Sequence, residues 1–509
     1  GRRSRDRSHD LAVCRSIIIN CRPDTMISVG ARSLVGEPGS QNRTRVATVR
    51  RRWLRPRWAE FGLLLLSFAP VLCGVAVLAS VWERNLLDQR FWPAYGFVVA
   101  FVACHLVLVA AGTRSSQLLL PLVACLAGIG MLLVTRLVPA LAPRQLLWIV
   151  LGLSIAMAVA VGPWETSLLS RFKYSVAAVG IVLVALTLVA GTDPNGSGDR
   201  LWLGLDGYVF QPSELLKVLL VVFLAGYLVD KRNELTQSRA RIWVLPLPPL
   251  AHLLPVGAMW GFCLLLLIVQ RDLGSALLFY GVFLTLLYVA LGRVWYVIVS
   301  MGLFLGGATL CYFLFAHVRL RVEIWLDPWI DPLGRSFQIV QAMYSLGSGG
   351  LFGRGFGNGY PLYVPATHTD YPFVALAEEG GLLAAVGLVL TYAVLATHGL
   401  SMAMEARQPY RQLLTTGLVA IIILQVVVIV GGNLRLIPLT GVTLPFVSYG
   451  GSSLLGSFLL IGLLLRMSHE EYEDQARRDS WRFQAEPGVS IKSGGRLTGR
   501  TGQDRKSGP

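Results

Sequence analysis

The chain has 509 residues, of which 54% are hydrophobic and only 15% are charged, and its mean hydropathy is +0.59. Soluble globular domains carry about 25% charged residues, so this composition excludes that class. It favours a polytopic membrane protein, in which each spanning helix needs roughly 20 mostly apolar residues. The net charge of +16 does not indicate a nucleic-acid partner, because Lys and Arg lie in short loops and tails and not on one basic face.

The two ends of the chain are polar. Residues 1–57 are rich in Arg and lack a periodic apolar pattern, so we expect a disordered basic N-terminal extension. Residues 469–509 are again charged and rich in Gly and Ser. We expect them to form a disordered cytoplasmic tail.

Between these ends, twelve apolar runs are long enough to span a membrane. We therefore predict an all-α polytopic bundle of about 12 transmembrane helices, with two accessory helices in residues 58–115 and ten in a core of residues 116–468. The predicted spans are 60–81, 92–112, 116–135, 145–162, 173–191, 212–229, 249–270, 273–291, 294–316, 372–397, 412–432 and 449–466.

The distribution of arginine and lysine predicts the orientation of the bundle. These residues cluster before the first span, after the sixth span, and between the tenth and eleventh spans. Cytoplasmic loops carry an excess of Lys and Arg, and all three clusters lie on one side in a twelve-span arrangement. Both termini are therefore expected in the cytoplasm, and the long segment 317–371 is expected on the outer side.

Charged residues near the sixth and eighth spans are the first candidates for a site, because ionisable residues within spans are costly and often functional. Glu214 and Lys217 are three residues apart and share one helix face. Two interpretations stay open with equal weight: a pair that neutralises itself at a helix interface, or the lining of a polar, water-filled cavity. Asp272 follows a break between two spans, and we expect it to cap the eighth helix.

The expected outer loop holds an unusual group of charges. Asp327 and Asp331 each precede a proline in "IWLDPWIDPLGRSFQ", although turn formation alone would explain such pairs. Arginines on the outer side break the positive-inside trend and favour an anionic ligand. These arginines are Arg319, Arg321, Arg335 and Arg354.

Glycines and isolated polar residues complete the loop. The glycines of 347–359 neither follow a strand nor precede GK[ST], so we expect no nucleotide there. No HExxH or CxxC pattern indicates zinc. His368 and Asp370 flank the entry to the tenth span, and Arg435 is the only charge in the Gly- and Pro-punctuated, re-entrant segment before the last span.

Five blocks of sequence in this order carry a resemblance to a known family. They are "QPSELLK", "QRDLGSALL", "LDPWIDPLGRSFQIVQAMYSLGSGGLFGRGFGNG", "VPATHTDYPFVALAEEGG" and "RLIPLTGVTLPFVSYGGSS". Together they resemble the SEDS family (shape, elongation, division and sporulation) over roughly residues 116–466. The chain departs from the family at Arg271, where proline is usual, and at "LGRSFQ", which replaces GSGYQ and puts Arg335 near the expected site.

The resemblance implies a peptidoglycan glycosyltransferase in the bacterial cytoplasmic membrane. Such enzymes polymerise lipid II at the outer face, for cell elongation or division, beside a class B penicillin-binding protein that crosslinks the product. By family position Asp331 is the expected general base, and Asp327 is the second candidate. The expected substrate-binding residues are Glu214, Lys217, Arg319, Arg321, Arg335, His368, Asp370 and Arg435.

The pyrophosphate of the leaving lipid requires positive charge, and our candidates for it are Arg319, Arg321, Arg335 and Lys217. Mg²⁺ or Mn²⁺ is an optional cofactor, and no nucleotide is expected. Two other functions stay open: a flippase or transporter for a lipid-linked precursor, and a scaffold that activates a partner synthase without catalysis. A scaffold would not need Asp331.

Overall fold

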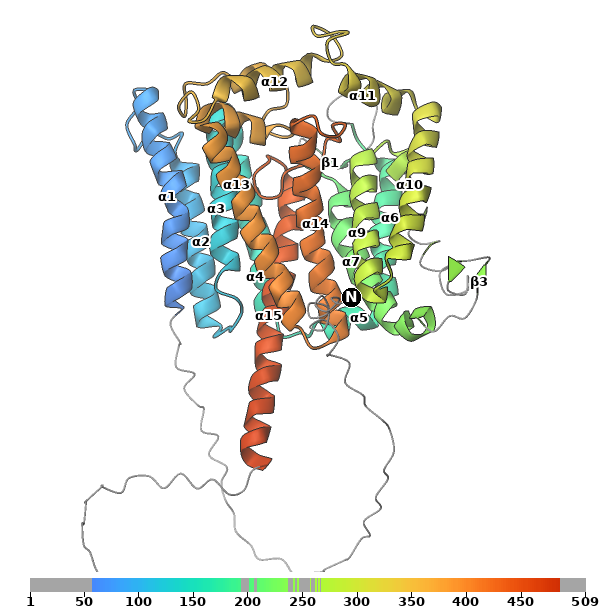
Figure 1. Cartoon of the computed structure of the whole chain (residues 1–509). Helices are drawn as coiled ribbons and strands as arrows, with labels where there is room; N and C mark the ends of the chain where they lie inside the picture. Colours follow the sequence, from blue (N-terminus) through green and yellow to red (C-terminus); the bar gives the residue numbers. More distant parts are fainter. Residues whose placement is uncertain are drawn as a thin grey trace, which may run out of the picture. The chain divides into compact units, whose positions relative to one another are not determined.

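A computed structural model of the chain describes residues 57–193, 201–205, 208–236, 241–242, 245–246, 257, 261–262, 264–265 and 267–485. The expected N-terminal extension lies outside the described residues except for Arg57. Helices dominate the described residues (Figure 1), which confirms the predicted all-α class. The short strands are β1 (Leu203–Leu205), β2 (Tyr208–Phe210), β3 (Arg241–Ile242) and β4 (Leu245–Pro246), which pair as two antiparallel hairpins.

Eleven helices within the described residues are long and apolar enough to cross a membrane. The remaining predicted span, 249–270, falls mostly outside the described residues, so the count of twelve stays a prediction. The spanning helices are α1 (Trp58–Val81), α2 (Trp92–Ala110), α3 (Leu119–Leu137), α4 (Ala142–Val161), α6 (Lys173–Ala190), α7 (Pro212–Thr236), α9 (Leu273–Leu291), α10 (Val294–Leu314), α13 (Pro372–Glu405), α14 (Pro409–Asn433) and α15 (Gly451–Ala485).

Shorter helices connect these spans. Within the described residues they are η1 (Pro139–Leu141), α5 (Ser167–Arg171), α11 (Ala316–Leu326), α12 (Phe337–Gly349) and η2 (Pro361–Tyr363). Figure 1 shows α11 and α12 lying across one end of the bundle, while the last turns of α15 project from the opposite end. The segment predicted as an outer loop, 317–371, therefore contains α12, η2 and nearly all of α11.

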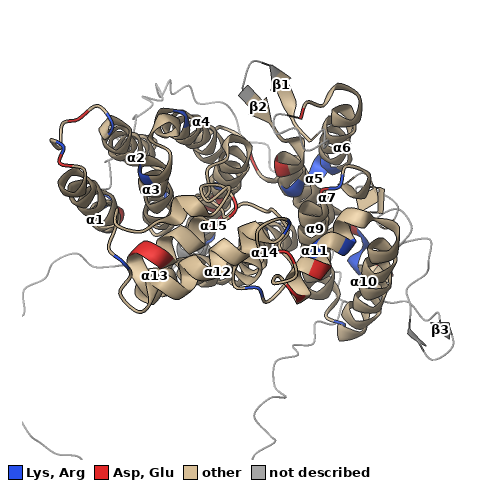
Figure 2. Ribbon diagram, turned by 90° about the horizontal axis from the view of Figure 1, so that it is seen from above, with Lys and Arg blue, Asp and Glu red and all other residues tan. Residues whose placement is uncertain are grey.

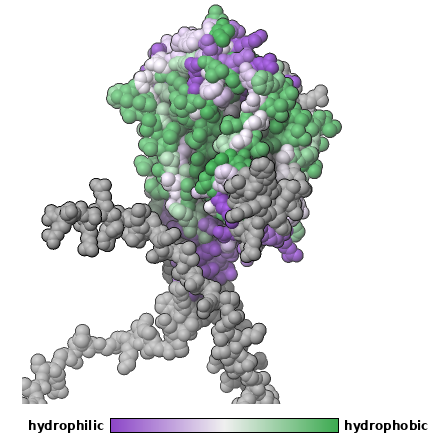
Figure 3. Space-filling view, turned by 45° about the vertical axis from the view of Figure 1, so that its right-hand side comes forward, coloured by the Kyte–Doolittle hydropathy of each residue, from purple (hydrophilic) through white to green (hydrophobic). Residues whose placement is uncertain are grey.

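The surface of the bundle agrees with a membrane environment. Figure 3 shows a belt of hydrophobic side chains between two hydrophilic ends, with α11 and α12 in the upper hydrophilic end. In α10, no residue of the most apolar 18-residue stretch is buried inside the protein. Apolar helices with no protein cover need lipid around them, so the chain is a multi-pass membrane protein.

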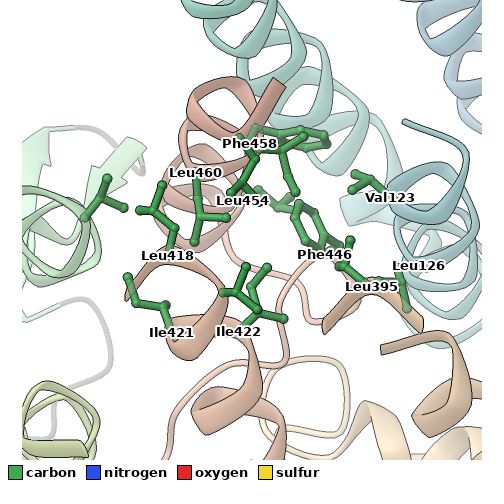
Figure 4. Packing of buried hydrophobic residues seen from close by; sticks show 14 of the residues in the cluster. Val123, Leu126, Leu395, Leu418, Ile421, Ile422, Phe446, Leu454, Phe458 and Leu460 are labelled. Atoms are coloured by element: carbon green, nitrogen blue, oxygen red, sulfur yellow. The ribbon is translucent and has the colours of Figure 1, made fainter. Parts of the chain in front are cut away.

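The core of the bundle is built around the end of the re-entrant segment. Phe446 is 1% exposed and packs edge-to-face on Phe458 of α15, with ring centroids 5.5 Å apart. Figure 4 shows these rings surrounded by apolar side chains of α3, α13 and α14, including Val123, Leu395 and Leu418. The non-helical segment around Phe446 is therefore enclosed by protein, which is the condition for irregular backbone within a membrane.

The prediction of a disordered tail from residue 469 is wrong for its first part, because α15 continues to Ala485. Ion pairs one turn apart stabilise this extension, as between Arg466 and Glu470 (2.9 Å) and between Arg477 and Glu473 (3.6 Å). Arg411 of α14, which is 7% exposed, adds ion pairs to Glu470, Glu471 and Asp474. Residues 486–509 lie outside the described residues.

Candidate functional site

Asp327 and Asp331 lie on the turn that joins α11 to α12. Asp327 follows the last residue of α11, and its Oδ1 accepts a hydrogen bond from the N–H of Trp329 at 3.0 Å. Asp331 uses Oδ2 to accept a hydrogen bond from the N–H of Arg335 at 3.0 Å. Both carboxylates therefore shape turns, as expected for Asp-Pro pairs, and each keeps one oxygen outside these bonds.

The two carboxylates differ in their surroundings. Asp327 is exposed, whereas Asp331 is half-buried. Gly334 lies directly beside the carboxylate of Asp331. A Cβ at position 334 would be only 2.5 Å from both Oδ1 and Oδ2 of Asp331. The absence of a side chain at Gly334 is thus what leaves room for the Asp331 carboxylate.

Arg435 reaches this turn from the end of α14. Its Nε donates to the carbonyl oxygen of Trp325 at 2.9 Å, and its Nη2 donates to that of Leu326 at 2.7 Å. In return, Nε1 of Trp325 donates to the carbonyl oxygen of Arg435 at 3.0 Å. The guanidinium predicted to bind substrate is therefore bonded to the end of α11.

The two arginines of α11 point to different partners. Arg319 lies 5.8 Å from the ring centroid of Tyr312, and its Nη2 donates to the carbonyl oxygen of Phe313 at 3.2 Å. Arg321 donates through Nη1 to the carbonyl oxygen of Leu439 at 3.0 Å. Both side chains are exposed, as is that of Arg335.

His368 and Asp370 lie between α11 and the re-entrant segment. The carbonyl oxygen of His368 accepts a hydrogen bond from the N–H of Tyr449 at 2.8 Å, and the two rings are 5.7 Å apart. Burial raises the pKa of Asp370 to about 6, although the nearby cation of Arg321 acts in the opposite direction. Burial also lowers the pKa of His368, so the imidazole is neutral at pH 7.

A separate polar cluster, which we call the inner cluster, lies where α7, α9 and α15 meet. Lys217 donates to Glu214, and both are buried. Asp272 accepts from the N–H of Ser275 at 3.1 Å, as predicted for an N-cap, and from the hydroxyl of Ser213 at 3.2 Å. Within the described residues, no hydrogen bond or ion pair joins Glu214, Lys217 or Asp272 to Asp327 or Asp331.

The inner cluster bears on the two open interpretations of Glu214 and Lys217. The pair is buried at 8% and 3% exposure and its charges neutralise each other. Gln211 and Ser452 extend the cluster, since the N–H of Gln211 donates to the Ser452 hydroxyl at 2.8 Å. Both interpretations of the pair stay open. A buried pair within a larger polar cluster is compatible with a self-neutralising contact at a helix interface and with the lining of a closed polar cavity.

The glycine-rich segment 347–359 packs against a break in α13. Gly381 has φ 72° and ψ −173°, which interrupts the helix and frees the carbonyl groups before it. The N–H groups of Arg354 and Gly355 donate to the carbonyl oxygens of Glu378 and Glu379, both at 3.0 Å. The glycines therefore allow close backbone contact between this segment and α13.

Sequence reasoning missed two arginines at the end of the bundle that carries α12. Arg136 of α3 donates to Glu379 at 3.0 Å and to the carbonyl oxygens of Gly357 and Gly359 at 3.0 and 3.1 Å. Arg144 of α4 hydrogen-bonds Tyr449. In the predicted orientation both arginines break the positive-inside trend in the same way as those of the loop, and this signal could have found them.

The donor set for a divalent cation is small. Within the described residues no three His, Cys, Asp or Glu side chains come together as metal ligands. Mg²⁺ is often held by only one or two carboxylates together with substrate phosphates and waters, and the free oxygen of Asp331 fits that role. A divalent cation stays a prediction.

The apolar belt and the layer formed by α11 and α12 across one end of the bundle define a polytopic membrane protein that presents carboxylates and arginines at one membrane face. A family model described as "Cell cycle protein", for FtsW, RodA and SpoVE, matches residues 117–473. The chain therefore belongs to the FtsW/RodA/SpoVE family.

Curated relatives and solved structures agree with this membership. The peptidoglycan glycosyltransferase RodA of Mycobacterium tuberculosis is 37% identical over 423 residues, which cover 80% of this chain and 90% of the relative. Stage V sporulation protein E of Bacillus subtilis is 34% identical over 289 residues, 56% of this chain and 76% of the relative.

Two solved structures share the fold. A chain from a structure titled as a peptidoglycan synthase complex that coordinates polymerization and crosslinking matches with a TM-score of 0.60 at 29% identity, covering 71% of this chain and 99% of that one. The rod shape determining protein RodA of Thermus thermophilus matches with a TM-score of 0.50 at 27% identity, covering 70% and 98%.

Proposed function

We propose that the chain is a peptidoglycan glycosyltransferase that polymerises lipid II at the outer face of the bacterial cytoplasmic membrane. The observation that carries this proposal is the Asp331 carboxylate, which is held by the N–H of Arg335 on a turn across one end of the bundle and keeps Oδ1 outside that bond. The names of the curated RodA and FtsW relatives support the same reaction class.

In the proposed reaction, Asp331 acts as the general base. It removes the proton from the 4-hydroxyl of the acceptor GlcNAc as that oxygen attacks C1 of the donor MurNAc. The bond between C1 and the pyrophosphate oxygen breaks, and its electron pair leaves with undecaprenyl pyrophosphate. A positioned base contributes roughly 10²–10⁴-fold to such a step.

Positive charge near the turn would stabilise the leaving pyrophosphate. Figure 2, seen from above, shows the Lys and Arg residues near α11 and α9. Arg335 and Arg321 are the best placed for this role. Arg335 is part of the turn that holds Asp331, and Arg321 lies beside Asp370. Arg319 turns toward Tyr312, and Lys217 is buried against Glu214, so both would have to change partners before they could contact substrate.

The proposal also includes orientation and a partner. The end of the bundle that carries α11 and α12 faces the outside, and both termini lie in the cytoplasm. A class B penicillin-binding protein binds the enzyme in the membrane and crosslinks the new glycan strand. The synthase complex among the structural relatives supports a partner of this kind.

One experiment tests the reaction and the base together. The purified full chain, with and without a class B penicillin-binding protein, is given fluorescent lipid II, and products are separated on a glycan gel. Asp331→Asn keeps the shape of the side chain and removes the base, so it should abolish polymer and leave lipid II binding intact. Asp327→Asn should lose less activity, because this carboxylate is exposed and serves the turn at Trp329.

The other two functions predict different results in that experiment. A flippase would move fluorescent lipid II across vesicle membranes without forming polymer, and Asp331→Asn would have no glycan phenotype. A scaffold would stimulate its partner equally well with and without the Asp331→Asn substitution. Normal glycan ladders from the Asp331→Asn protein would remove Asp331 as the base.

A further inference from the structure

The carboxyl end of α11 cannot complete its own hydrogen bonds. The last carbonyl groups of a helix need partners from beyond the helix. Here the N–H of the C-cap residue Asp327 donates to the carbonyl oxygen of Glu323, and the next residue, Pro328, has no N–H. The N–H of Trp329, next in the chain, is already donated to Asp327. The carbonyl oxygens of Trp325 and Leu326 therefore need donors from elsewhere.

Arg435 supplies both donors from 109 residues further along the chain, through Nε and Nη2. Arginine is suited to this task, because its planar guanidinium presents several donors in a fixed geometry, and cations are favoured at helix C-termini. The indole N–H of Trp325 returns a bond to the Arg435 carbonyl oxygen. We call these three hydrogen bonds the α11 clamp.

The backbone of Arg435 has a conformation that glycine adopts more easily than any other residue. Arg435 is the first residue past the C-cap of α14 and has φ 59°, in the left-handed region. The N–H groups of Arg435 and Leu436 donate to the carbonyl oxygens of Gly432 (3.1 Å) and Gly431 (2.7 Å), which is the Schellman motif. Glycine is the usual residue there, so substitution of Arg435 by glycine removes the guanidinium without straining the backbone.

We infer that Arg435 is a positioning residue for the proposed reaction: through the α11 clamp it fixes the end of α11 and so the turn that carries Asp331. This inference rests on Asp331 as the base. Arg435 contacts no reacting atom in this role. It acts on the turn through the carbonyl groups of Trp325 and Leu326, and the Asp331 turn begins five residues after Leu326.

Arg435→Gly is the sharpest test, because glycine suits the left-handed backbone and only the guanidinium is lost. We expect normal expression and thermal stability, a fall in kcat on the order of 100-fold from misplacement of the base, and little change in KM for fluorescent lipid II. Hydrogen–deuterium exchange should speed up in residues 325–336.

Glu83→Gly is the matched control. Glu83 has φ 53° and occupies the same position of a Schellman motif after α1, where the N–H groups of Glu83 and Arg84 donate to Ser80 and Ala79. Its side chain is exposed. Glu83→Gly should therefore leave both kcat and exchange in residues 325–336 unchanged.

Chemical rescue separates positioning from simple damage. Arg435 lines a cavity of about 520 Å³ together with Trp325, Leu326 and Met343, so a small cation can reach the space that the missing side chain leaves. Added methylguanidinium should restore part of the kcat of Arg435→Gly and slow its exchange. It should not restore Asp331→Asn.

A second variant protects the test against a folding defect. Trp325→Phe keeps an aromatic ring and removes one of the three clamp bonds, the one that the indole N–H donates. It should give a smaller loss of kcat with faster exchange in the same residues. Unchanged exchange in both variants would overturn the clamp, and faster exchange with full kcat would overturn its positioning role. An active Asp331→Asn enzyme would instead overturn the proposed base, so the two failures are distinguishable.

Discussion

The main-chain N–H of Arg335 donates a 3.0 Å hydrogen bond to Oδ2 of Asp331. The Asp331 carbonyl oxygen accepts a second bond from the N–H of Ser336 at 3.1 Å, so side chain and backbone of the same aspartate close one turn. This turn leads directly into α12, and it determines where the carboxylate points. The arrangement makes the position of Asp331 sensitive to its immediate neighbours.

Gly334→Ala should move the Asp331 carboxylate out of its hydrogen bond, because the added Cβ would lie 2.5 Å from both carboxylate oxygens. We expect roughly 10- to 100-fold slower polymerisation and an unfolding free energy within about 1 kcal/mol of the parent. Gly347→Ala is the control, since a Cβ there meets nothing within 4 Å. Equal rates for both variants, measured with fluorescent lipid II, would show that the carboxylate tolerates displacement.

Asp370 should make stability depend on pH. Its pKa is raised from 3.8 to about 6 by burial, so between these values the folded protein binds more protons than the unfolded chain. The free energy of unfolding therefore falls as pH rises through this window, by no more than about 3 kcal/mol. Asp370→Asn should remove that part of the pH dependence of the melting temperature.

Arg321→Gln extends this test, because Arg321 lowers the pKa of Asp370. Without the cation, the upper edge of the pH window should move above 6. Scanning fluorimetry of detergent-solubilised protein across the window measures both variants. An Asp370→Asn protein with the parent's pH profile would exclude this carboxyl as the titrating group.

Accessibility from the two sides of the membrane tests the orientation. Leu362 in η2 is 62% exposed, and Met404 near the end of α13 is 75% exposed. In a cysteine-free background, Leu362→Cys should react with a membrane-impermeant maleimide on intact cells, and Met404→Cys should react only after lysis. Labelling of both cysteines on intact cells would contradict the predicted topology.

Arg411→Glu should destabilise the protein. Arg411 is 7% exposed and pairs with Glu470, Glu471 and Asp474, so the substitution buries a further carboxylate among three. Loss of one partner of a buried pair costs about 3–5 kcal/mol, which should lower both the melting temperature and the amount of protein in membranes.

Arg477→Glu is the control for that substitution. Its side chain is 69% exposed and its ion pair with Glu473 is 3.6 Å long, and exposed pairs contribute about 0–1 kcal/mol. Melting temperatures that fall equally for Arg411→Glu and Arg477→Glu would mean that the network around Arg411 does not hold the α15 extension.

The sequence by itself determined the class of fold and the family. Apolar runs of spanning length predicted eleven helices that the structure contains, because the hydrophobic requirement of a bilayer leaves a local signal in every span. The N-cap at Asp272 was also predictable, since capping involves residues three apart in the chain. The helical extension of α15 was missed because its support includes Arg411, a partner some 60 residues away in the chain.

Only the tertiary structure decided what the charged residues in and around α11 contact. From sequence, Arg435 and Arg321 were both expected to bind substrate. In the structure Arg435 caps α11 and Arg321 lies beside Asp370. Such partners are separated by about 50 to 110 residues, and no periodicity or composition connects them. A hydrogen bond depends on position in space to within a few tenths of an ångström, which only the packing of the helices sets.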